Sequence, residues 1–150
     1  MKPRGVGEVC GSRLTLPSAW SNVLAAMGAI VVITTVGTEE QANLIAEELI
    51  ARRHASCVNI LPGVRSLYRW QGKICRDSEY MLVIKTLERE YEALERAIKE
   101  LHSYELPEIL AFGVKRGEQG FLDWIGGSLD KHAVFSDEED TGVPIDEANL

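Results

Sequence analysis

The strongest pattern in the chain lies between Cys57 and Thr86, where successive side chains point alternately to two opposite sides. Side chains that alternate with a period of two are typical of β-strands. Two such runs flank Gln71-Gly72, where glycine supplies the positive φ that a tight hairpin turn needs. Pro62-Gly63 interrupts the first run, because proline donates no ladder hydrogen bond and glycine tolerates a bulge. The segment therefore predicts a long, bent β-hairpin.

The predicted hairpin is longer than one protomer is expected to cover. Each arm has about a dozen residues, whereas strands usually have about 5–6. Both faces carry apolar side chains near the outer end, and uncovered apolar faces and edges favour association. We therefore expect another copy of the chain to cover the hairpin.

A short strand and a helix precede the hairpin. The β-branched run at 29–35 is apolar on both sides, which predicts a central strand buried on two faces. Thr38 and Gln41 form a capping box, in which Thr38 caps the helix and the Gln41 side chain reaches back. The apolar stripe of this helix comprises Ala42, Ile45, Ala46, Leu49 and Ile50. The helix is expected to end near Arg53-His54, where positive charge suits the helix C-terminus.

The chain after the hairpin repeats the alternation of helix and strand. An amphipathic helix is predicted over 88–102, a short strand over 109–114 and a closing helix over 118–125. We expect Gly126-Gly127 to end the closing helix. Its inward side chains are predicted to be Phe121, Leu122 and Ile125. The order of elements predicts an α+β, ferredoxin-like split βαβ (βαββαβ) fold, with two helices on one face of a four-stranded antiparallel sheet.

The composition indicates one domain of a soluble globular protein. The 150 residues are 45% hydrophobic and 26% charged, with a net charge of −7. We interpret 1–28 as a mobile N-terminal extension, 29–129 as the folded domain and 130–150 as a disordered acidic tail. Met27 is considered as an alternative translation start. We expect no nucleic-acid partner, since no basic patch stands out, and no membrane helix, since no apolar run reaches ~18 residues.

The cysteines and the absence of catalytic motifs narrow the class of protein further. Cys10, Cys57 and Cys75 are odd in number and show no pairing pattern, which favours a reducing compartment and predicts a cytoplasmic protein. The sequence has no Ser-His-Asp set, phosphate-binding loop or supported carboxylate pair. We therefore predict that the chain is not an enzyme.

A series of motifs in fixed order resembles the CutA family, the divalent-cation tolerance proteins. The matching segments, within 30–128, are CVNILPG at 57–63, SLYRWQGK at 66–73, Glu79, IKT at 84–86, HSYELPEI at 102–109 and Trp124-Ile125. The resemblance implies a homotrimer in which hairpin arms of neighbouring protomers join into sheets. It also implies a metal-binding protein of copper and other divalent-cation tolerance, with zinc as a further cation.

The resemblance also points to ligand positions. The copper site described for bacterial relatives uses a cysteine on the first strand and two histidines after the second helix, which map to Thr34 and Leu101-His102. Only His102 is retained, and neither threonine nor leucine replaces a soft sulfur or nitrogen donor. A second set, Cys57, Glu79 and His102, offers thiolate, carboxylate and imidazole, which together can hold Cu(II) or Zn(II). The sequence leaves open whether they meet within a protomer or between protomers.

Each candidate residue also has a structural alternative. Cys57 suits a small buried apolar position, Glu79 an ion pair with Lys85 or a neighbour's arginine, and His102 a cation at a helix C-terminus. Four aromatic residues are expected either to line a pocket between subunits or to pack in the trimer interface. These four are Tyr68, Trp70, Tyr104 and Trp124.

The sequence thus predicts a trimeric, copper-binding protein of divalent-cation homeostasis. Two alternatives stay open: a small-molecule-sensing trimer like the PII signalling proteins, and a structural scaffold without a specific metal site. The tight Gln71-Gly72 turn counts against the first, because PII proteins carry a long loop at that connection.

Overall fold

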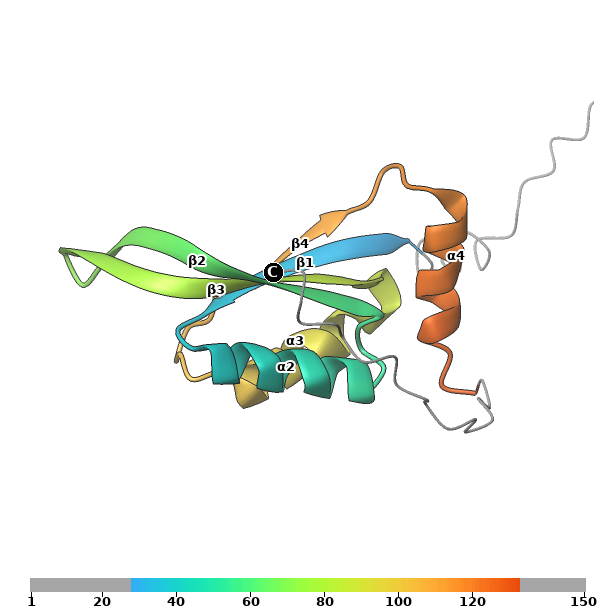
Figure 1. Cartoon of the computed structure of the whole chain (residues 1–150), viewed down its shortest axis with the longest axis horizontal. Helices are drawn as coiled ribbons and strands as arrows, with labels where there is room; N and C mark the ends of the chain where they lie inside the picture. Colours follow the sequence, from blue (N-terminus) through green and yellow to red (C-terminus); the bar gives the residue numbers. More distant parts are fainter. Residues whose placement is uncertain (1–27, 133–150) are drawn as a thin grey trace, which may run out of the picture.

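Four antiparallel strands form the centre of the described part of the chain, residues 28–132 of a computed structural model. They are β1 (Ala29–Val36), β2 (Cys57–Trp70), β3 (Lys73–Leu87) and β4 (Leu110–Gly113). Across the sheet their order is β2-β3-β1-β4, so β1 lies between the third and fourth strands (Figure 1). This is the arrangement of a split βαβ unit. The predicted α+β fold with a four-stranded antiparallel sheet is confirmed.

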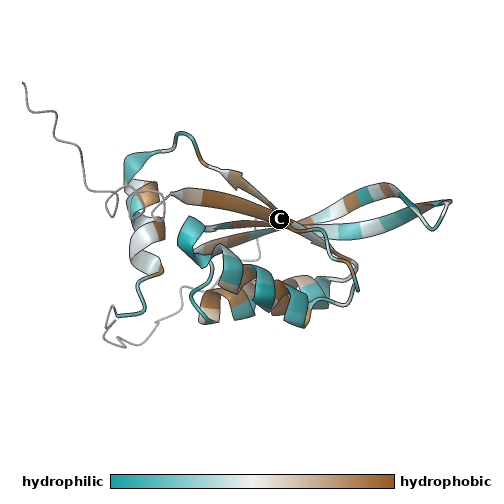
Figure 2. Cartoon of the chain, turned by 180° about the vertical axis from the view of Figure 1, so that it is seen from behind, coloured by the Kyte–Doolittle hydropathy of each residue, from teal (hydrophilic) through white to brown (hydrophobic). Residues whose placement is uncertain are grey.

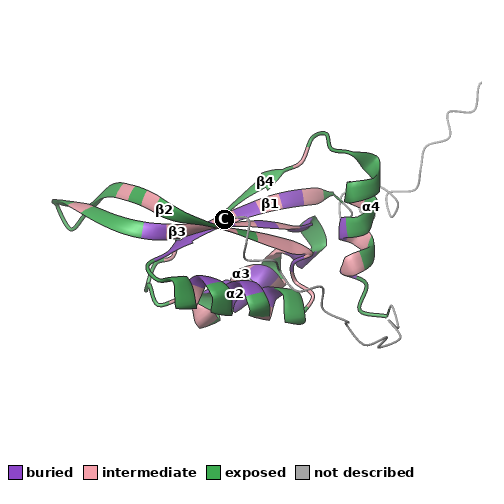
Figure 3. Cartoon of the chain, viewed as in Figure 1, coloured by how far each residue is buried: buried purple, intermediate pink, exposed green. Residues whose placement is uncertain are grey.

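Two helices cover one face of the sheet and a third lies at its end. Helices α2 (Glu39–Ala51) and α3 (Tyr91–Leu101) lie side by side under the sheet, and α4 (Gln119–Ser128) lies at the end remote from the hairpin tip (Figure 1). A short 3₁₀ helix, η1 (Glu88–Glu90), begins the segment predicted as one helix over 88–102. The fully buried side chains between sheet and helices include Val32, Ile45, Leu49, Leu82, Ile84, Leu94 and Ile98 (Figure 3). Each such side chain contributes roughly 1.5–3 kcal/mol of apolar burial.

The first helix begins as predicted but uses its capping residues differently. Thr38 is the N-cap, and its Oγ1 accepts a hydrogen bond of 3.2 Å from Gln41 N. The Gln41 side chain does not reach back. Its Nε2 donates to Leu101 O at 3.3 Å and its Oε1 accepts from Ser103 Oγ at 2.7 Å. The end of α3 offers carbonyls without helical partners, and Gln41 satisfies one of them. Ile50 is also exposed, not part of the buried stripe.

The hairpin has the predicted turn and bend. Gln71 and Gly72 have φ values of 46° and 78°, which is the two-residue turn whose twist matches that of paired strands. The pairing of β2 with β3 shifts between Leu61 and Val64, and Gly63 there has a φ of 74°. Beyond this bulge the two strands extend past the helices, with mostly exposed side chains (Figure 3).

The sheet face opposite the helices is apolar and bare in the single chain. Val32 is buried under the helices, so its neighbours Val31 and Ile33 point to the other face. There Val31 pairs with Phe112 and Ile33 with Leu110, and both partners on β4 are exposed. Figure 2 shows the same apolar character in the central strands. The single chain thus leaves a continuous apolar surface uncovered on this face.

The closing helix ends later than predicted, and one of its predicted inward side chains is exposed. Helix α4 runs through Gly126-Gly127 and ends at Ser128, because Ile125 and Leu129 bury themselves against Leu87 and hold the helix on both sides of the glycines. Phe121 is exposed and stacks on Trp124, with ring centroids 5.5 Å apart, so it does not point inward.

The predictions for 1–28 and 130–150, including the start at Met27, lie almost entirely outside the described residues. Among the helices in residues 28–132, none has the length and apolarity to span a membrane.

Thr34 gives a test of the core. Its side chain is fully buried, and its Oγ1 is the one such polar atom without a hydrogen-bond partner in the described part of the chain. We predict that Thr34→Val raises the free energy of unfolding by about 1 kcal/mol, because it removes an unsatisfied buried hydroxyl while keeping the shape. Chemical denaturation measures the change.

Thr86→Val is the matched control. Thr86 is equally buried, but its Oγ1 donates to His54 O at 2.6 Å. Its replacement should lower the free energy of unfolding by about 1 kcal/mol or more, since a carbonyl is left unpaired. Equal destabilisation by both variants would contradict the interpretation of Thr34.

Candidate functional site

A buried carboxylate lies in the middle of β3. Glu79 is only 5% exposed and pairs with Val64, the first residue after the bulge of β2. Its Oε1 accepts a hydrogen bond of 2.9 Å from Tyr104 Oη. Burial and this bond raise the pKa of Tyr104 to about 12, so the phenol keeps its proton and donates it. Gly37 makes room for the phenol, since a Cβ at position 37 would lie 3.0 Å from Tyr104 Oη.

Glu79 differs from Glu90, the other buried carboxylate in residues 28–132. Glu90 lies 3.2 Å from His54 Nδ1, 3.5 Å from Lys131 Nζ and 3.9 Å from Arg89 Nε. No ion pair within the described chain involves Glu79. A buried charge without an opposite charge is costly, so Glu79 is the carboxylate best placed to receive a cation from outside the chain.

The ion pair suggested between Glu79 and Lys85 does not form. Lys85 Nζ donates instead to Asn59 Oδ1 and, at 3.2 Å, to Val83 O. Lys85 lies six residues from Glu79 along β3, which corresponds to about 20 Å in an extended strand. The suggestion was wrong because the length of one strand separates the two charges.

His102 completes a network around Glu79. It is the C-cap of α3, and its Nε2 donates to Thr35 O at 2.9 Å while its Nδ1 accepts from Tyr104 N at 3.0 Å. These two bonds fix the neutral tautomer. Burial lowers the pKa of His102, against the opposite effects of the Thr35 bond and of the Glu79 charge. The imidazole is therefore neutral here, not the cation of a helix terminus. We call Glu79, Tyr104, His102 and Thr35 the Glu79 network.

Cys57 lies outside this network. It begins β2 opposite Lys85, about 20 Å along the sheet from Glu79. It is half-buried, not enclosed as a core residue would be. Within residues 28–132, no three His, Cys, Asp or Glu side chains lie close enough together to hold a metal ion. The structure thus links Glu79 and His102 through Tyr104 but leaves Cys57 apart.

The four aromatic residues are spread over the molecule. Tyr68 Oη donates to Asp77 Oδ2 on the exposed outer hairpin, and this bond is the main cause that raises the pKa of Tyr68 to about 12. Trp70 lies at the hairpin turn, and Trp124 lies on α4 at the opposite end of the chain (Figure 1). Only Tyr104 belongs to the Glu79 network. The four therefore cannot line one pocket unless several copies of the chain supply them.

Gly37 and Thr35 were not among the site residues predicted from the sequence. The one local signal is that a single glycine separates the last residue of β1 from the cap of α2. That glycine leaves the space which Tyr104 fills, and a tyrosine 67 positions later gives no local sign of this contact.

A family model for the CutA1 divalent ion tolerance protein matches residues 30–128. The chain belongs to this family. It is 44% identical over 95 residues to the divalent-cation tolerance protein CutA of Thermus thermophilus. The aligned residues cover 63% of this chain and 92% of that protein. It is 40% identical over 99 residues to the chloroplastic protein CutA 1 of Oryza sativa, covering 66% of this chain and 56% of that protein.

Solved structures of CutA1 proteins have the same fold. CutA from Xylella fastidiosa superposes with a TM-score of 0.68 at 37% identity, covering 69% of this chain and 99% of the other. The protein from Archaeoglobus fulgidus, described as periplasmic, gives 0.66 at 33% identity, covering 68% and 99%. Named relatives thus include chloroplastic and periplasmic proteins, so family membership does not assign this chain to the cytoplasm.

Tyr104→Phe tests the Glu79 network. The substitution removes the donor to a buried carboxylate, and we predict a loss of about 1–3 kcal/mol in the free energy of unfolding. Tyr68→Phe is the matched control, because its hydroxyl bonds to an exposed carboxylate and its loss should cost well under 1 kcal/mol. Urea denaturation of both variants measures the difference, and equal losses would contradict a special role for Glu79.

Proposed function

We propose that the protein is a homotrimeric divalent-cation-binding protein that acts in cation tolerance by binding, not by catalysis. The observation that carries this proposal is the buried Glu79 carboxylate, which has a neutral imidazole nearby and no cationic partner in the described chain. The names of its relatives link the family to divalent cations. Copper is the cation we expect first and zinc second, because imidazole and carboxylate donors suit both.

Assembly into a trimer is supported by the uncovered surface of the single chain. The bare sheet face presents Val31, Ile33, Leu110 and Phe112, and the hairpin extends beyond the helices that would otherwise protect it. Contiguous apolar surface of this kind is typical of protein interfaces.

A charge on the bare sheet face should dissociate the trimer. Phe112 is 54% exposed in the single chain, so we predict that Phe112→Lys leaves the fold intact but lowers the mass in solution from about three times 16.6 kDa to that of one chain. Leu44→Lys is the control, since Leu44 is 47% exposed on α2, which lies on the opposite side of the sheet. Light scattering decides: a wild-type monomer, or a Phe112→Lys trimer, would rule out this interface.

The donors in one chain do not make a complete metal site. Glu79 supplies a carboxylate, and His102 can ligate through Nδ1 only if that atom gives up its hydrogen bond from Tyr104 N. Two donors are fewer than the three or four that copper or zinc usually takes from a protein. We infer that a further donor, with Cys57 as the predicted one, comes from a neighbouring copy.

Calorimetric titration with Cu(II) tests the cation. We predict binding of micromolar strength or weaker, reduced about tenfold or more by Glu79→Gln and by His102→Ala, since each removes one of few donors. Cys75→Ser is the control, because Cys75 lies on the outer hairpin away from the network. Cys57→Ser tests whether Cys57 of a neighbouring copy is the further donor.

The same titration has a predicted pH dependence. The imidazole must be neutral to ligate, and burial lowers the pKa of His102, so binding should persist at pH 6.5 and fall only below it.

A scaffold without a specific metal site is the second candidate. It is favoured by the two hydrogen bonds that occupy both ring nitrogens of His102. If Glu79→Gln and His102→Ala titrate like the wild type while the trimer persists, this candidate replaces the first. A PII-like sensor is disfavoured by the two-residue turn of the hairpin.

The cysteines bear on the location of the protein. The free thiols of Cys57 and Cys75 suit a reducing compartment, and we infer a cytoplasmic location from them.

A further inference from the structure

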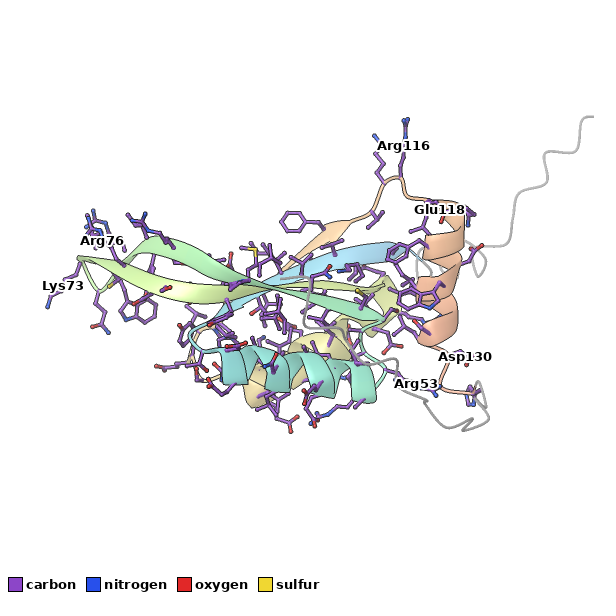
Figure 4. All side chains as sticks on the ribbon, viewed as in Figure 1. Arg53, Lys73, Arg76, Arg116, Glu118 and Asp130 are labelled. Atoms are coloured by element: carbon purple, nitrogen blue, oxygen red, sulfur yellow. The ribbon has the colours of Figure 1, made fainter. Side chains whose placement is uncertain are left out.

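The outer end of the hairpin is strongly basic, so the expectation that the chain has no basic patch was wrong there, although the whole chain carries a net charge of −7. Positions 64–76 contain four cationic residues and no acidic one. They are Arg65, Arg69, Lys73 and Arg76. All four are exposed, and no ion pair in residues 28–132 involves any of them. Figure 4 shows Lys73 and Arg76 projecting into solvent at this end.

The strand register places three of these cations on one face together with apolar side chains. Arg65 pairs with Ser78, Leu67 with Arg76 and Arg69 with Ile74. Partners across a ladder point to the same side of the sheet. Leu67 and Ile74 are 60% and 59% exposed. We call Arg65, Leu67, Arg69, Ile74 and Arg76 the arginine face. It suits a ligand that combines carboxylates with apolar groups.

The same chain contains such a ligand near its C-terminus. The segment 137–147 reads DEEDTGVPIDE and carries six carboxylates around Val143 and Ile145. We propose that the arginine face binds segment 137–147 of a neighbouring copy of the chain. Guanidinium groups pair with carboxylates in bidentate geometry, and Leu67 and Ile74 offer contacts to the two apolar residues.

The length of the chain limits which of its own carboxylates can reach Arg76. Leu129 packs against Leu87 at the inner end of β3, whereas Arg76 lies eleven residues away along that strand, about 36 Å. The eleven residues from Leu129 to Asp140 span at most about 40 Å when fully extended. The first four carboxylates of the segment could therefore reach Arg76 of their own chain only along a straight path, whereas Asp146 and Glu147 have enough chain to reach it. A neighbour's segment is the occupant that lets the carboxylates at both ends of 137–147 take part. This step rests on the proposed assembly of copies.

A nucleic acid is a poorer match for this surface. Proteins that bind single strands stack bases on aromatic rings beside the cations. Here the aromatic residues Tyr68 and Trp70 pair with Cys75 and Lys73, which places them on the opposite face from the three arginines. The net charge of −7 also opposes a polyanion.

Carbodiimide cross-linking of the full-length protein tests the proposal, because it joins amines to carboxylates that are in contact. Arg76→Lys keeps the charge of the arginine face and supplies an amine there. We expect covalent dimers on a denaturing gel, and mass spectrometry should find position 76 joined to 137–147. The yield should fall roughly tenfold at about 1 M NaCl, where the Debye length is only about 3 Å.

The matched control is Arg116→Lys, which places an amine on the exposed loop between β4 and α4 (Figure 4). It should give few links to 137–147. Equal yields from the two variants, insensitivity to salt, or links confined to single chains would overturn the proposal. RNA binding at physiological salt that Arg76→Glu abolishes would also overturn it, in favour of a nucleic acid partner.

A second variant separates this contact from the assembly itself. Replacing Asp137, Glu138, Glu139 and Asp140 by their amides should abolish most of the links while light scattering still gives a trimer. If the Arg76→Lys protein forms a trimer but gives no links to 137–147, the proposed contact is refuted and the proposed assembly is not. A monomer would refute the proposed assembly and, with it, delivery of the segment by a neighbour.

Discussion

The pairing of β3 with two partners of unequal length is the constraint on which the rest of the structure depends. β1 pairs with β3 only as far as Val36 and Tyr80, whereas β2 continues beside it to the turn at Gln71-Gly72. One half of β3 is therefore a central strand over a helical layer, and the other half is one arm of a free hairpin. Glu79 is the first residue beyond the end of β1. The Glu79 network fills this boundary, where the chain leaves β1 through Gly37 and where α3 ends.

The sequence was sufficient for features that a short segment determines by itself. Alternation predicted both arms of the hairpin, Gly72 predicted its turn, and Thr38 predicted the start of α2. Features that depend on a distant partner were not predictable in this way. Gln41 caps the end of α3 because that end lies beside it, and Gly126-Gly127 stays helical because Ile125 and Leu129 are held by Leu87.

The candidate site also combines residues that the sequence could name with contacts that depend on distant parts of the chain. Glu79 and His102 could be named from residue type and family resemblance, and they do share one network. Cys57 could not be placed, because the distance between two residues on different strands depends on a register that the sequence pattern alone does not give. The contrast between Glu79 and Glu90 was equally hidden, since the partners of Glu90, His54 and Lys131, come from segments before and after it in the chain.

Helix α4 contains three glycines, and its adjacent pair Gly126-Gly127 has a consequence for local stability. Each glycine in a helix interior costs about 1 kcal/mol relative to alanine. The buried contacts that offset this cost form a small cluster of Leu87, Ile125 and Leu129, separate from the main core. Helix α4 is thus a cooperative unit of its own, whose amide protons should exchange with solvent through openings that leave the sheet and its two covering helices folded. The part of the chain that follows α4 is therefore joined to the domain through this small cluster and not through the main core.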